Sequence, residues 1–282
     1  MGSGPYLTAL LVTLATCFAV QAALLRAFHG RTHKSESNFF SSVARLQTGI
    51  APPPTVMLLG SSMTGRLPDR ASGFDGVANL GCDGGSALPA LRAIARGDFP
   101  APTILVVEAN TLDRGGEQGE LDEAIRSGWF WAGVRVPLLG ATARPSAFAY
   151  SSLFAWNRRP QEERIGRVEF SPIPKPWGAP VALTPAAEAA ASELASLLDA
   201  AKQRGARVLL VQLPSRRKPN AEALALAHEV SLRTDTGFAD LTTALAEPEI
   251  AYTDGVHLDG PSATLCLRLI LGSCETLAPP AR

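Results

Sequence analysis

From about residue 55 onward, short apolar runs alternate along the chain with longer stretches that have helical signals. The clearest apolar run is Thr103–Glu108, and Val56–Leu59 is a shorter one between Pro54 and Gly60. Nearly continuous apolar runs of this length are typical of strands that are covered on both faces of a sheet. Further strands are predicted at residues 76–79, 207–212 and 237–240.

Helices are predicted between these strands. One follows the glycine-rich loop at residues 80–86 and ends near Arg96, and another runs from Thr184, an N-cap followed by proline, to Gly205. Two more are expected at about residues 221–232 and 261–271. Strands that alternate with helices predict an α/β fold with a doubly wound, mostly parallel sheet in a three-layer α/β/α arrangement.

The N-terminal residues predict a membrane-spanning helix. Tyr6–Leu25 is a run of twenty residues without a charge, which is long enough to cross roughly 30 Å of hydrocarbon as a helix. A buried helix of a soluble protein fits less well, because no amphipathic pattern organises the polar positions. A cleavable signal peptide is the closer alternative, since Val20–Ala22 resembles a cleavage site, but the positively charged n-region is missing. We therefore expect residues 1–27 to form an uncleaved transmembrane anchor.

The residues after this anchor give conflicting indications of its orientation. Arg26, Arg31 and Lys34 follow the span, and the positive-inside rule would keep the rest of the chain in the cytoplasm. Residues 28–54 are polar and end in Ala51–Pro54, which predicts a semi-rigid linker. Such a spacer suits a domain, here residues 55–282, that is held off the surface of a bilayer.

An insertion interrupts the pattern of strands and helices at about residues 113–180. It is rich in proline and glycine and concentrates aromatic residues: Trp129, Phe130, Trp131, Phe148, Tyr150, Phe154 and Trp156. Two interpretations stay open. The insertion packs on its own domain, or its rings form a surface for the membrane interface or for a membrane partner, where such rings are common.

The composition disfavours several classes of function. Lys plus Arg and Asp plus Glu number 26 each, which removes the simple electrostatic case for a nucleic-acid partner. The cysteines are too few and too scattered for a disulfide scaffold or a Cys-x-x-Cys metal site, and we expect free thiols at Cys17, Cys82, Cys266 and Cys274. The glycine-rich loop lacks the Gly-Lys-Ser/Thr of a phosphate-binding loop. We predict neither a metal site nor a cofactor.

Candidate catalytic residues follow the predicted strands. Ser62 lies in the Gly-Ser-Ser turn after the first strand, where a hydroxyl is exposed at the carboxyl edge of a parallel sheet. Asp254 and His257, near the other end of the chain, offer the base and the orienting carboxylate that a serine nucleophile requires. Gly84 and Asn110 also follow predicted strands. Because the carboxyl ends of parallel strands meet at one edge, we expect these residues to converge.

In this order, the residues resemble the four sequence blocks of the SGNH/GDSL hydrolase family, whose fold is flavodoxin-like. The first block, Gly-Asp-Ser in the family, matches Gly60–Ser62, and the second, Asn-x-x-x-x-Gly, matches Asn79–Gly84. The third, Gly-x-Asn-Asp, matches Glu108–Thr111, and the last, Asp-x-x-His, matches Asp254–His257. The resemblance spans roughly residues 55–272. Each block is short, but the set in this order is fairly specific.

The resemblance implies a role for each matched residue. It puts the nucleophile on Ser62 and completes a catalytic triad with His257 and Asp254. It puts an oxyanion-hole amide on Gly84 and a side-chain oxyanion donor on Asn110. His257 would accept the proton of Ser62 during attack on an ester carbonyl, while Asp254 would hold the imidazole in place.

Three positions depart from the family pattern: Ser61 replaces aspartate, Glu108 replaces glycine, and Thr111 replaces aspartate. Such departures are typical of divergent, membrane-anchored members, several of which accompany membrane-bound O-acyltransferases that acylate cell-envelope polysaccharides. Glu108 places a carboxylate near a site that must stabilise an oxyanion, unless its side chain points into the protein, which is the interpretation we favour.

The resemblance therefore predicts a membrane-anchored serine esterase or O-acyltransferase that acts on acyl esters of a cell-envelope glycan. The expected partners are an acylated glycan or another ester substrate, the membrane itself, and a membrane-bound O-acyltransferase. The expected location of the catalytic domain is periplasmic or otherwise extracytoplasmic. The alternative is a non-catalytic module that keeps the fold and assists a membrane-bound O-acyltransferase.

Overall fold

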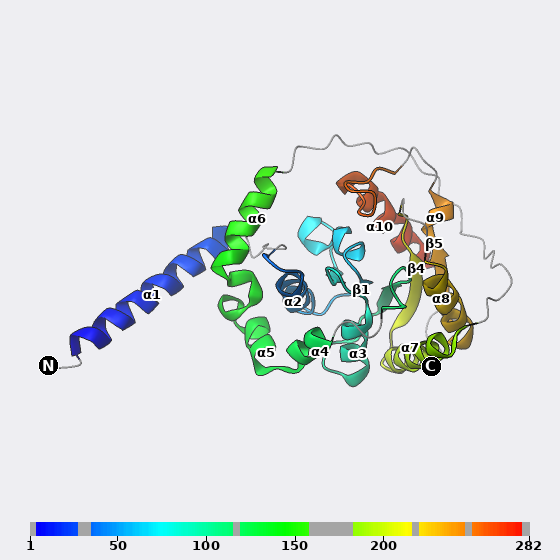
Figure 1. Ribbon diagram of the computed structural model, residues 1–282, viewed down its shortest axis with the longest axis horizontal. Helices are drawn as coiled ribbons and strands as arrows, with labels where there is room; N and C mark the ends of the chain where they lie inside the picture. The colour runs from blue at the N-terminus through cyan, green and yellow to red at the C-terminus, as the bar shows by residue number, and fades with distance from the viewer. Residues whose placement is uncertain are drawn as a thin grey trace.

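The computed structural model describes residues 4–27, 35–114, 119–157, 183–215, 220–245 and 250–277 (Figure 1). A five-stranded sheet lies at its centre, with the strand order β2-β1-β3-β4-β5. The strands are β1 (Val56–Gly60), β2 (Val77–Gly81), β3 (Ile104–Glu108), β4 (Arg207–Gln212) and β5 (Gly237–Asp240). Every described pair of neighbours is parallel. The α/β class and the parallel sheet expected from the sequence are confirmed.

Helices connect and cover the strands. The longer ones are α2 (Asn38–Gly49), α3 (Leu88–Arg96), α4 (Gly119–Arg126), α5 (Gly128–Arg135), α6 (Pro145–Asn157), α7 (Pro185–Gln203), α8 (Ala221–Arg233) and α10 (Gly260–Glu275). The short helices are η1 (Thr64–Arg66), η2 (Arg70–Ser72), η3 (Pro137–Leu139), η4 (Ala141–Ala143) and α9 (Leu241–Ala244). The helices predicted after residues 86, 184, 220 and 260 correspond to α3, α7, α8 and α10.

Apolar side chains on the strands alternate between two cores. Leu59, Leu105 and Leu210 belong to one core, together with residues of α2, α3, α7 and α8. Leu58 and Val106, their neighbours along the strands, belong to another core that contains residues of α10. Strand side chains point alternately to the two faces of a sheet, so both faces of this sheet are covered.

The predicted linker at residues 28–54 needs correction, because α2 lies within it and is part of the folded domain. Val43 and Leu46 are fully buried, and Ile50 is nearly so. These apolar residues recur at spacings of three and four, which places them on one side of a helix. Residues 28–34, the first part of the predicted linker, lie outside the described residues.

The described part of the predicted insertion packs mainly on α2 rather than on the sheet. Gln47 of α2 donates to the Phe130 carbonyl at 2.9 Å and accepts from the Ala141 amide at 2.8 Å. Phe130 is fully buried and stacks on Phe99. Buried side chains of this part therefore pack on its own domain, whereas Trp129, Tyr150 and Trp156 are exposed. Residues 115–118 and 158–182 lie outside the described residues.

α1 (Gly4–Ala27) extends away from the rest of the molecule (Figure 1). By length and composition it is able to span a membrane, and none of its residues is buried. A signal sequence near an N-terminus has the same properties. The described fold therefore supports an N-terminal segment that can enter a membrane, without an indication of its orientation.

Candidate active site

The turn after β1 places Ser62 at the carboxyl edge of the sheet. β1 ends at Gly60, and η1 begins only four residues later, at Thr64. Ser61 is buried and Ser62 is half-buried. The Ser62 hydroxyl therefore reaches the surface, although the turn that carries it lies inside the protein.

His257 reaches Ser62 from the other end of the chain. Its Nε2 atom lies 2.7 Å from the Ser62 Oγ atom, across 195 positions of sequence. Its Nδ1 atom lies 2.6 Å from Asp254 Oδ2. The three side chains form the chain of hydrogen bonds in which a carboxylate orients an imidazole and the imidazole accepts a serine proton.

A short loop before α10 fixes the relative positions of Asp254 and His257. Asp254 Oδ1 accepts from the backbone amides of Val256 at 3.1 Å and His257 at 2.8 Å. The Thr253 amide donates to the His257 carbonyl at 2.9 Å. Gly255 has a φ of 80°, a backbone conformation that glycine adopts without strain. The carboxylate thus orients both the backbone and the ring of His257.

These contacts also set the ionisation of Asp254. Partial burial raises the pKa of its carboxyl group, but hydrogen bonds from the His257 amide and ring and from the Val256 amide outweigh this effect and lower the pKa to about 2. Asp254 is therefore an anion at neutral pH, and its Oδ2 atom accepts the Nδ1–H of His257. This leaves the lone pair of His257 Nε2 directed at the Ser62 hydroxyl.

Glu108 at the end of β3 accepts several hydrogen bonds from the turn that carries Ser62. Its Oε2 atom accepts from the backbone amides of Ser61 at 2.8 Å and Thr64 at 3.1 Å, and from the Thr64 hydroxyl at 2.6 Å. Its Oε1 atom accepts from the Ser61 hydroxyl at 2.7 Å. That hydroxyl also accepts from the Met63 amide at 3.1 Å, so its own proton is directed to Glu108. Each of these contacts suits a carboxylate acting only as an acceptor.

The Glu108 side chain is 1% exposed and points into the protein, as the sequence interpretation favoured. A Cβ atom at position 60 would lie 2.6 Å from the Glu108 Cβ atom, so the close approach of β1 and β3 requires glycine there. Gly81 has a comparable role at the end of β2, where a Cβ atom would lie 2.7 Å from the Ser61 carbonyl oxygen. The glycines at the strand ends therefore make room for the turn and its carboxylate.

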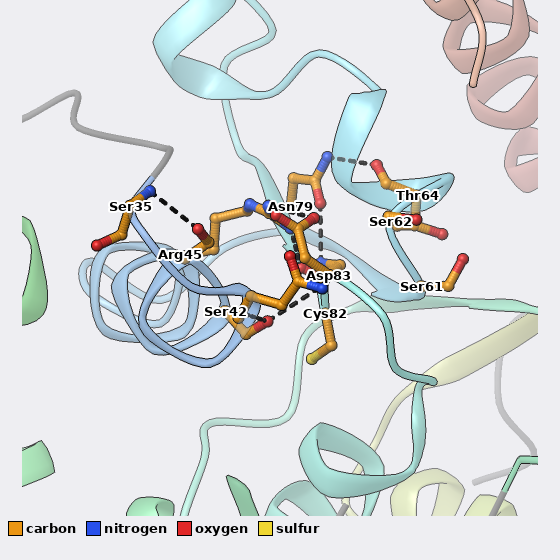
Figure 2. Close-up of polar contacts among 12 residues, drawn as sticks. Ser35, Ser42, Arg45, Ser61, Ser62, Thr64, Asn79, Cys82 and Asp83 are labelled. Atoms are coloured by element: carbon orange, nitrogen blue, oxygen red, sulfur yellow. Dashed lines mark hydrogen bonds and ion pairs between the residues drawn. The ribbon is translucent and has the colours of Figure 1, made fainter. Parts of the chain in front are cut away.

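Asn79 of β2 supports the same turn from another side. Its Nδ2 atom donates to the Thr64 carbonyl at 2.6 Å and to the Leu67 carbonyl at 2.7 Å, and its Oδ1 atom accepts from the Gly81 amide at 2.9 Å. Figure 2 shows the Asn79 side chain directed toward Thr64. The first asparagine of the family-like pattern thus has a structural role.

The loop after β2 is tied to α2 by a buried ion pair. Arg45 Nη2 lies 2.6 Å from Asp83 Oδ1, and both side chains are almost completely buried. Arg45 also donates to the Gly81 carbonyl, and the Asp83 amide donates to Ser42 Oγ at 2.9 Å (Figure 2). A buried charge pair is strongly destabilising when one partner is removed, so α2 is required for the conformation of the loop that carries Gly84.

Two backbone amides are free to bind an oxyanion. Within the described ranges, the amides of Ser62 and Gly84 have no hydrogen-bond acceptor. Gly84 is exposed and has a φ of 73°. Backbone amides directed at a developing oxyanion are the usual components of an oxyanion hole. The role that the resemblance implies for Gly84 stays a prediction.

Asn110 lies near this edge, but its side chain already has partners. Its Nδ2 atom donates to the Leu213 carbonyl at 2.9 Å, and its Oδ1 atom accepts from the Leu213 amide at 2.8 Å. This reciprocal pair joins the chain just beyond β3 to the chain just beyond β4. Only the second hydrogen of the amide nitrogen remains for an oxyanion.

Other chemistry finds less support in the described residues. No group of three or more His, Cys, Asp or Glu side chains able to hold a metal ion occurs among them. Cys82 lies close in sequence to Gly84, but burial raises the pKa of its thiol to about 12, which disfavours the reactive thiolate. Cys266 and Cys274, both in α10, are buried free thiols as expected.

Sequence reasoning missed three residues that shape this site: Glu108 as the acceptor for the turn, Asn79 as its second support, and Arg45 as the partner of Asp83. A signal existed for Glu108, because a charged residue directly after four apolar strand residues is at the carboxyl edge of the sheet. Arg45 gave no comparable signal, since arginine in a polar segment is ordinarily exposed. Arg216, Arg217 and Lys218 follow β4, where the sequence favours a solvated turn over a substrate contact, and they lie outside the described residues.

Comparison of the chain with protein-family models, with curated proteins and with solved structures finds no match.

Proposed function

We propose that this protein is an SGNH-type serine esterase or O-acyltransferase, with a three-layer α/β/α domain that carries a Ser62–His257–Asp254 triad. The observation that carries the proposal is the 2.7 Å contact between His257 Nε2 and Ser62 Oγ, together with the 2.6 Å contact between His257 Nδ1 and Asp254 Oδ2. The contact joins residues from opposite ends of the chain, so local sequence alone does not produce it.

In the proposed reaction, Ser62 Oγ attacks the carbonyl carbon of an ester while its proton passes to His257 Nε2. The Ser62 and Gly84 amides, with the free hydrogen of Asn110 Nδ2, stabilise the negative oxygen of the tetrahedral intermediate. Collapse of the intermediate breaks the bond to the alcohol, which takes the proton from His257 and leaves an acyl group on Ser62. Water or a glycan hydroxyl then attacks this acyl group, with His257 accepting the proton of the attacking group. The bond between Ser62 Oγ and the acyl carbon breaks, and Ser62 takes the proton back from His257.

The proposed substrate is an acyl ester, such as an acetyl ester, of a cell-envelope glycan, and the proposed location is the outer side of the cytoplasmic membrane, anchored by α1. The support is the resemblance to divergent, membrane-anchored members of the family and the length and apolar character of α1. A C-terminal fusion tests the location. Alkaline phosphatase should be active there and a green fluorescent reporter dark, whereas the reverse pattern would exclude envelope glycans as substrates.

The chemical proposal is tested with p-nitrophenyl acetate and the full chain in detergent. We expect hydrolysis that Ser62→Ala lowers by roughly 10⁶-fold, the scale for loss of a triad serine. Ser273→Ala is a matched control, because Ser273 lies on α10 and its hydroxyl donates only within that helix, to the Leu269 carbonyl. A serine-reactive phosphonate should modify Ser62. Hydrolysis that survives Ser62→Ala unchanged would overturn the proposal.

The alternative is a non-catalytic module that assists a membrane-bound O-acyltransferase. One observation favours it: both polar atoms of the Asn110 side chain are engaged by Leu213, so the oxyanion hole lacks a fully free side-chain donor. This alternative predicts no hydrolysis and no labelling of Ser62 by the phosphonate, although the protein is folded. Co-purification with the acyltransferase that survives Ser62→Ala would then support it.

A further inference from the structure

Exposed apolar side chains are concentrated in one segment of the molecule. Outside α1, the large apolar side chains that are exposed in the described residues are Trp129, Val136, Leu139, Tyr150, Leu153, Trp156 and Leu232. All of them except Leu232 lie within residues 129–156, which form α5, η3, η4 and α6. Clusters of this kind on a soluble domain mark a surface that another apolar phase covers.

The same segment receives the C-terminal end of α1. Gln21 Nε2 donates to the Leu138 and Ala143 carbonyls, and Leu25 shares a cleft with Val136 and Leu138. The amide of Gln21 is thus used to fix the apolar helix to η3 and η4. The folded domain is therefore attached directly to the base of α1 in the described structure.

This attachment sets the depth of the segment in a membrane. The uncharged stretch of α1 ends at Leu25, and Gln21 lies four residues earlier, which is roughly 6 Å along a helix axis. If α1 crosses the bilayer, the Gln21 contacts are at the boundary between hydrocarbon and headgroups. η3, η4 and the elements packed on them then lie at the same boundary.

α6 has the composition and the position of a helix that lies on this boundary. It contains no charged residue between Pro145 and Asn157. Tyr150, Leu153 and Trp156, which are 42%, 55% and 84% exposed, recur at intervals of three and so occupy one side of the helix. Both α6 and the end of α1 pack against η4, which brings them to the same region of the molecule. Tyr and Trp side chains prefer the headgroup layer, because their rings are apolar and their tips are polar.

We propose that the α6–η3 surface, defined as Val136, Leu139, Tyr150, Leu153 and Trp156, rests in the interfacial layer of the bilayer that α1 crosses. The occupant of this surface is lipid, because the surface is continuous with α1, whose described residues are all unburied. The proposal rests on the anchoring part of the proposed function but not on its chemistry. Its consequence is that the domain is held against the membrane in one orientation, rather than on a loose tether.

The test uses the full chain in vesicles of phosphatidylcholine and phosphatidylglycerol, with an environment-sensitive fluorophore on a single cysteine. Cys17→Ser removes the exposed thiol, and the remaining cysteines are buried, with a pKa raised to about 12 for each, so they react poorly with maleimides. Leu153→Cys reports on the α6–η3 surface. Leu232→Cys is the matched control, because Leu232 is 61% exposed, against 55% for Leu153, but lies on α8.

We expect the label at position 153 to shift its emission to the blue and to lose most of its fluorescence to lipids that carry a spin label near the headgroup. The label at position 232 should show neither effect. A label at Leu11→Cys in α1 tests the membrane anchor separately from the α6–η3 surface. This label should be quenched by lipids that carry the spin label deep in the acyl chain. Circular dichroism before reconstitution verifies that each variant is folded.

Quenching at position 11 without quenching at position 153 would overturn the proposal and leave the anchor intact. A blue-shifted label at position 153 that no lipid quenches would also overturn it, in favour of a second copy of the chain on this surface. Absence of quenching at position 11 would instead contradict the anchor of the proposed function. Quenching at position 153 under those circumstances would show that the surface binds lipid without α1.

Discussion

Two carboxylates support the Ser62–His257 contact, one from each side, and they are held in very different environments. Glu108 is 1% exposed and accepts hydrogen bonds from two residues of the Ser62 turn. The Asp254 side chain is 51% exposed and accepts from residues within three positions of itself. The sheet therefore positions Ser62 through long-range contacts, while a solvent-facing loop positions His257 through local ones.

The different burial of the two carboxylates determines whether a substitution changes the stability of the fold or the rate of the proposed reaction. A buried carboxylate that satisfies several buried donors contributes to the folded state, because each stranded donor costs free energy. An exposed carboxylate contributes little to stability, because solvent screens it. In the proposed reaction, its effect would appear when charge develops on the imidazole. We therefore expect substitutions at Glu108 to lower the free energy of unfolding as well as the rate, and those at Asp254 to lower the rate with little change in the free energy of unfolding.

The largest effect is expected for Asp254→Asn on turnover. The substitution keeps the shape of the side chain but removes the charge that fixes the His257 tautomer, which lowers turnover by roughly 10⁴-fold in a comparable triad. Its midpoint of thermal unfolding should stay close to that of the parent protein. Initial rates with p-nitrophenyl acetate and thermal unfolding of the same sample measure both quantities. A rate within tenfold of the parent would mean that Asp254 does not act through His257.

Substitution of Glu108 should have a large effect on the free energy of unfolding. Glu108→Ala leaves the Ser61 and Thr64 amides and hydroxyls buried without an acceptor, and each stranded group costs about 1–3 kcal/mol. We expect a loss of about 4 kcal/mol or more in the free energy of unfolding, which is a large part of the stability of a typical domain.

Glu108→Gln is the informative companion, because it keeps the volume and one acceptor oxygen. It should recover part of the lost stability while turnover stays lower by roughly 10²-fold, the scale of a small misplacement of a reacting group. Denaturant unfolding and the initial rate give the two values. If Glu108→Gln matches the parent protein in both, the ionised carboxylate is not needed and the comparison with Asp254 fails.

The difference between local contacts at Asp254 and long-range contacts at Glu108 also determines how much of the site could be predicted from the sequence. The Asp-x-x-His pair is local, and its spacing alone indicates that the two side chains meet. The strands of the sheet were predictable for a similar reason, because Val56–Leu59 and Arg207–Gln212 are continuous apolar runs with turn residues at their ends. Both predictions depend only on residues close together along the chain.

The supports of the turn were not predictable in this way. The Glu108 carboxylate and the Ser61 amide that it accepts from are 47 positions apart, and the fit depends on the missing side chain of Gly60. Residues 28–54, which include α2, were expected to be a linker because the segment is polar and ends in Ala51–Pro54. Arg45 and Gln47 are two of its polar residues. They are buried only because Asp83, Phe130 and Ala141 offer them partners. Such pairings follow from the tertiary structure, not from local patterns.

Asn110 extends the comparison, because it follows Glu108 by two residues and belongs to the same edge of the sheet. If its free hydrogen binds the oxyanion, Asn110→Ala should lower turnover by roughly 10²–10³-fold, equivalent to about 2.7–4 kcal/mol of barrier. The loss of its bonds with Leu213 should also lower the midpoint of thermal unfolding. A lower midpoint of thermal unfolding with an unchanged rate would mean that Asn110 stabilises the fold and does not bind the oxyanion.

The smallest expected effect is the pH dependence of the contribution that the ionised Asp254 carboxylate makes to stability. Its pKa falls from an ordinary value of 3.8 to about 2 in the folded protein. A lowered pKa means that the ionised carboxylate favours the folded state. This contribution is complete above about pH 4 and disappears as the pH falls through 2. Because the side chain is half exposed, we expect the contribution to be roughly 1 kcal/mol or less.

Thermal unfolding of the parent protein and of Asp254→Asn in detergent, from pH 7 down to pH 2, measures this contribution as a small difference in midpoint that narrows below pH 4. A difference that grows as the pH falls would have the wrong sign for a lowered pKa, and would mean that the hydrogen bonds from the His257 and Val256 amides do not stabilise the ionised form.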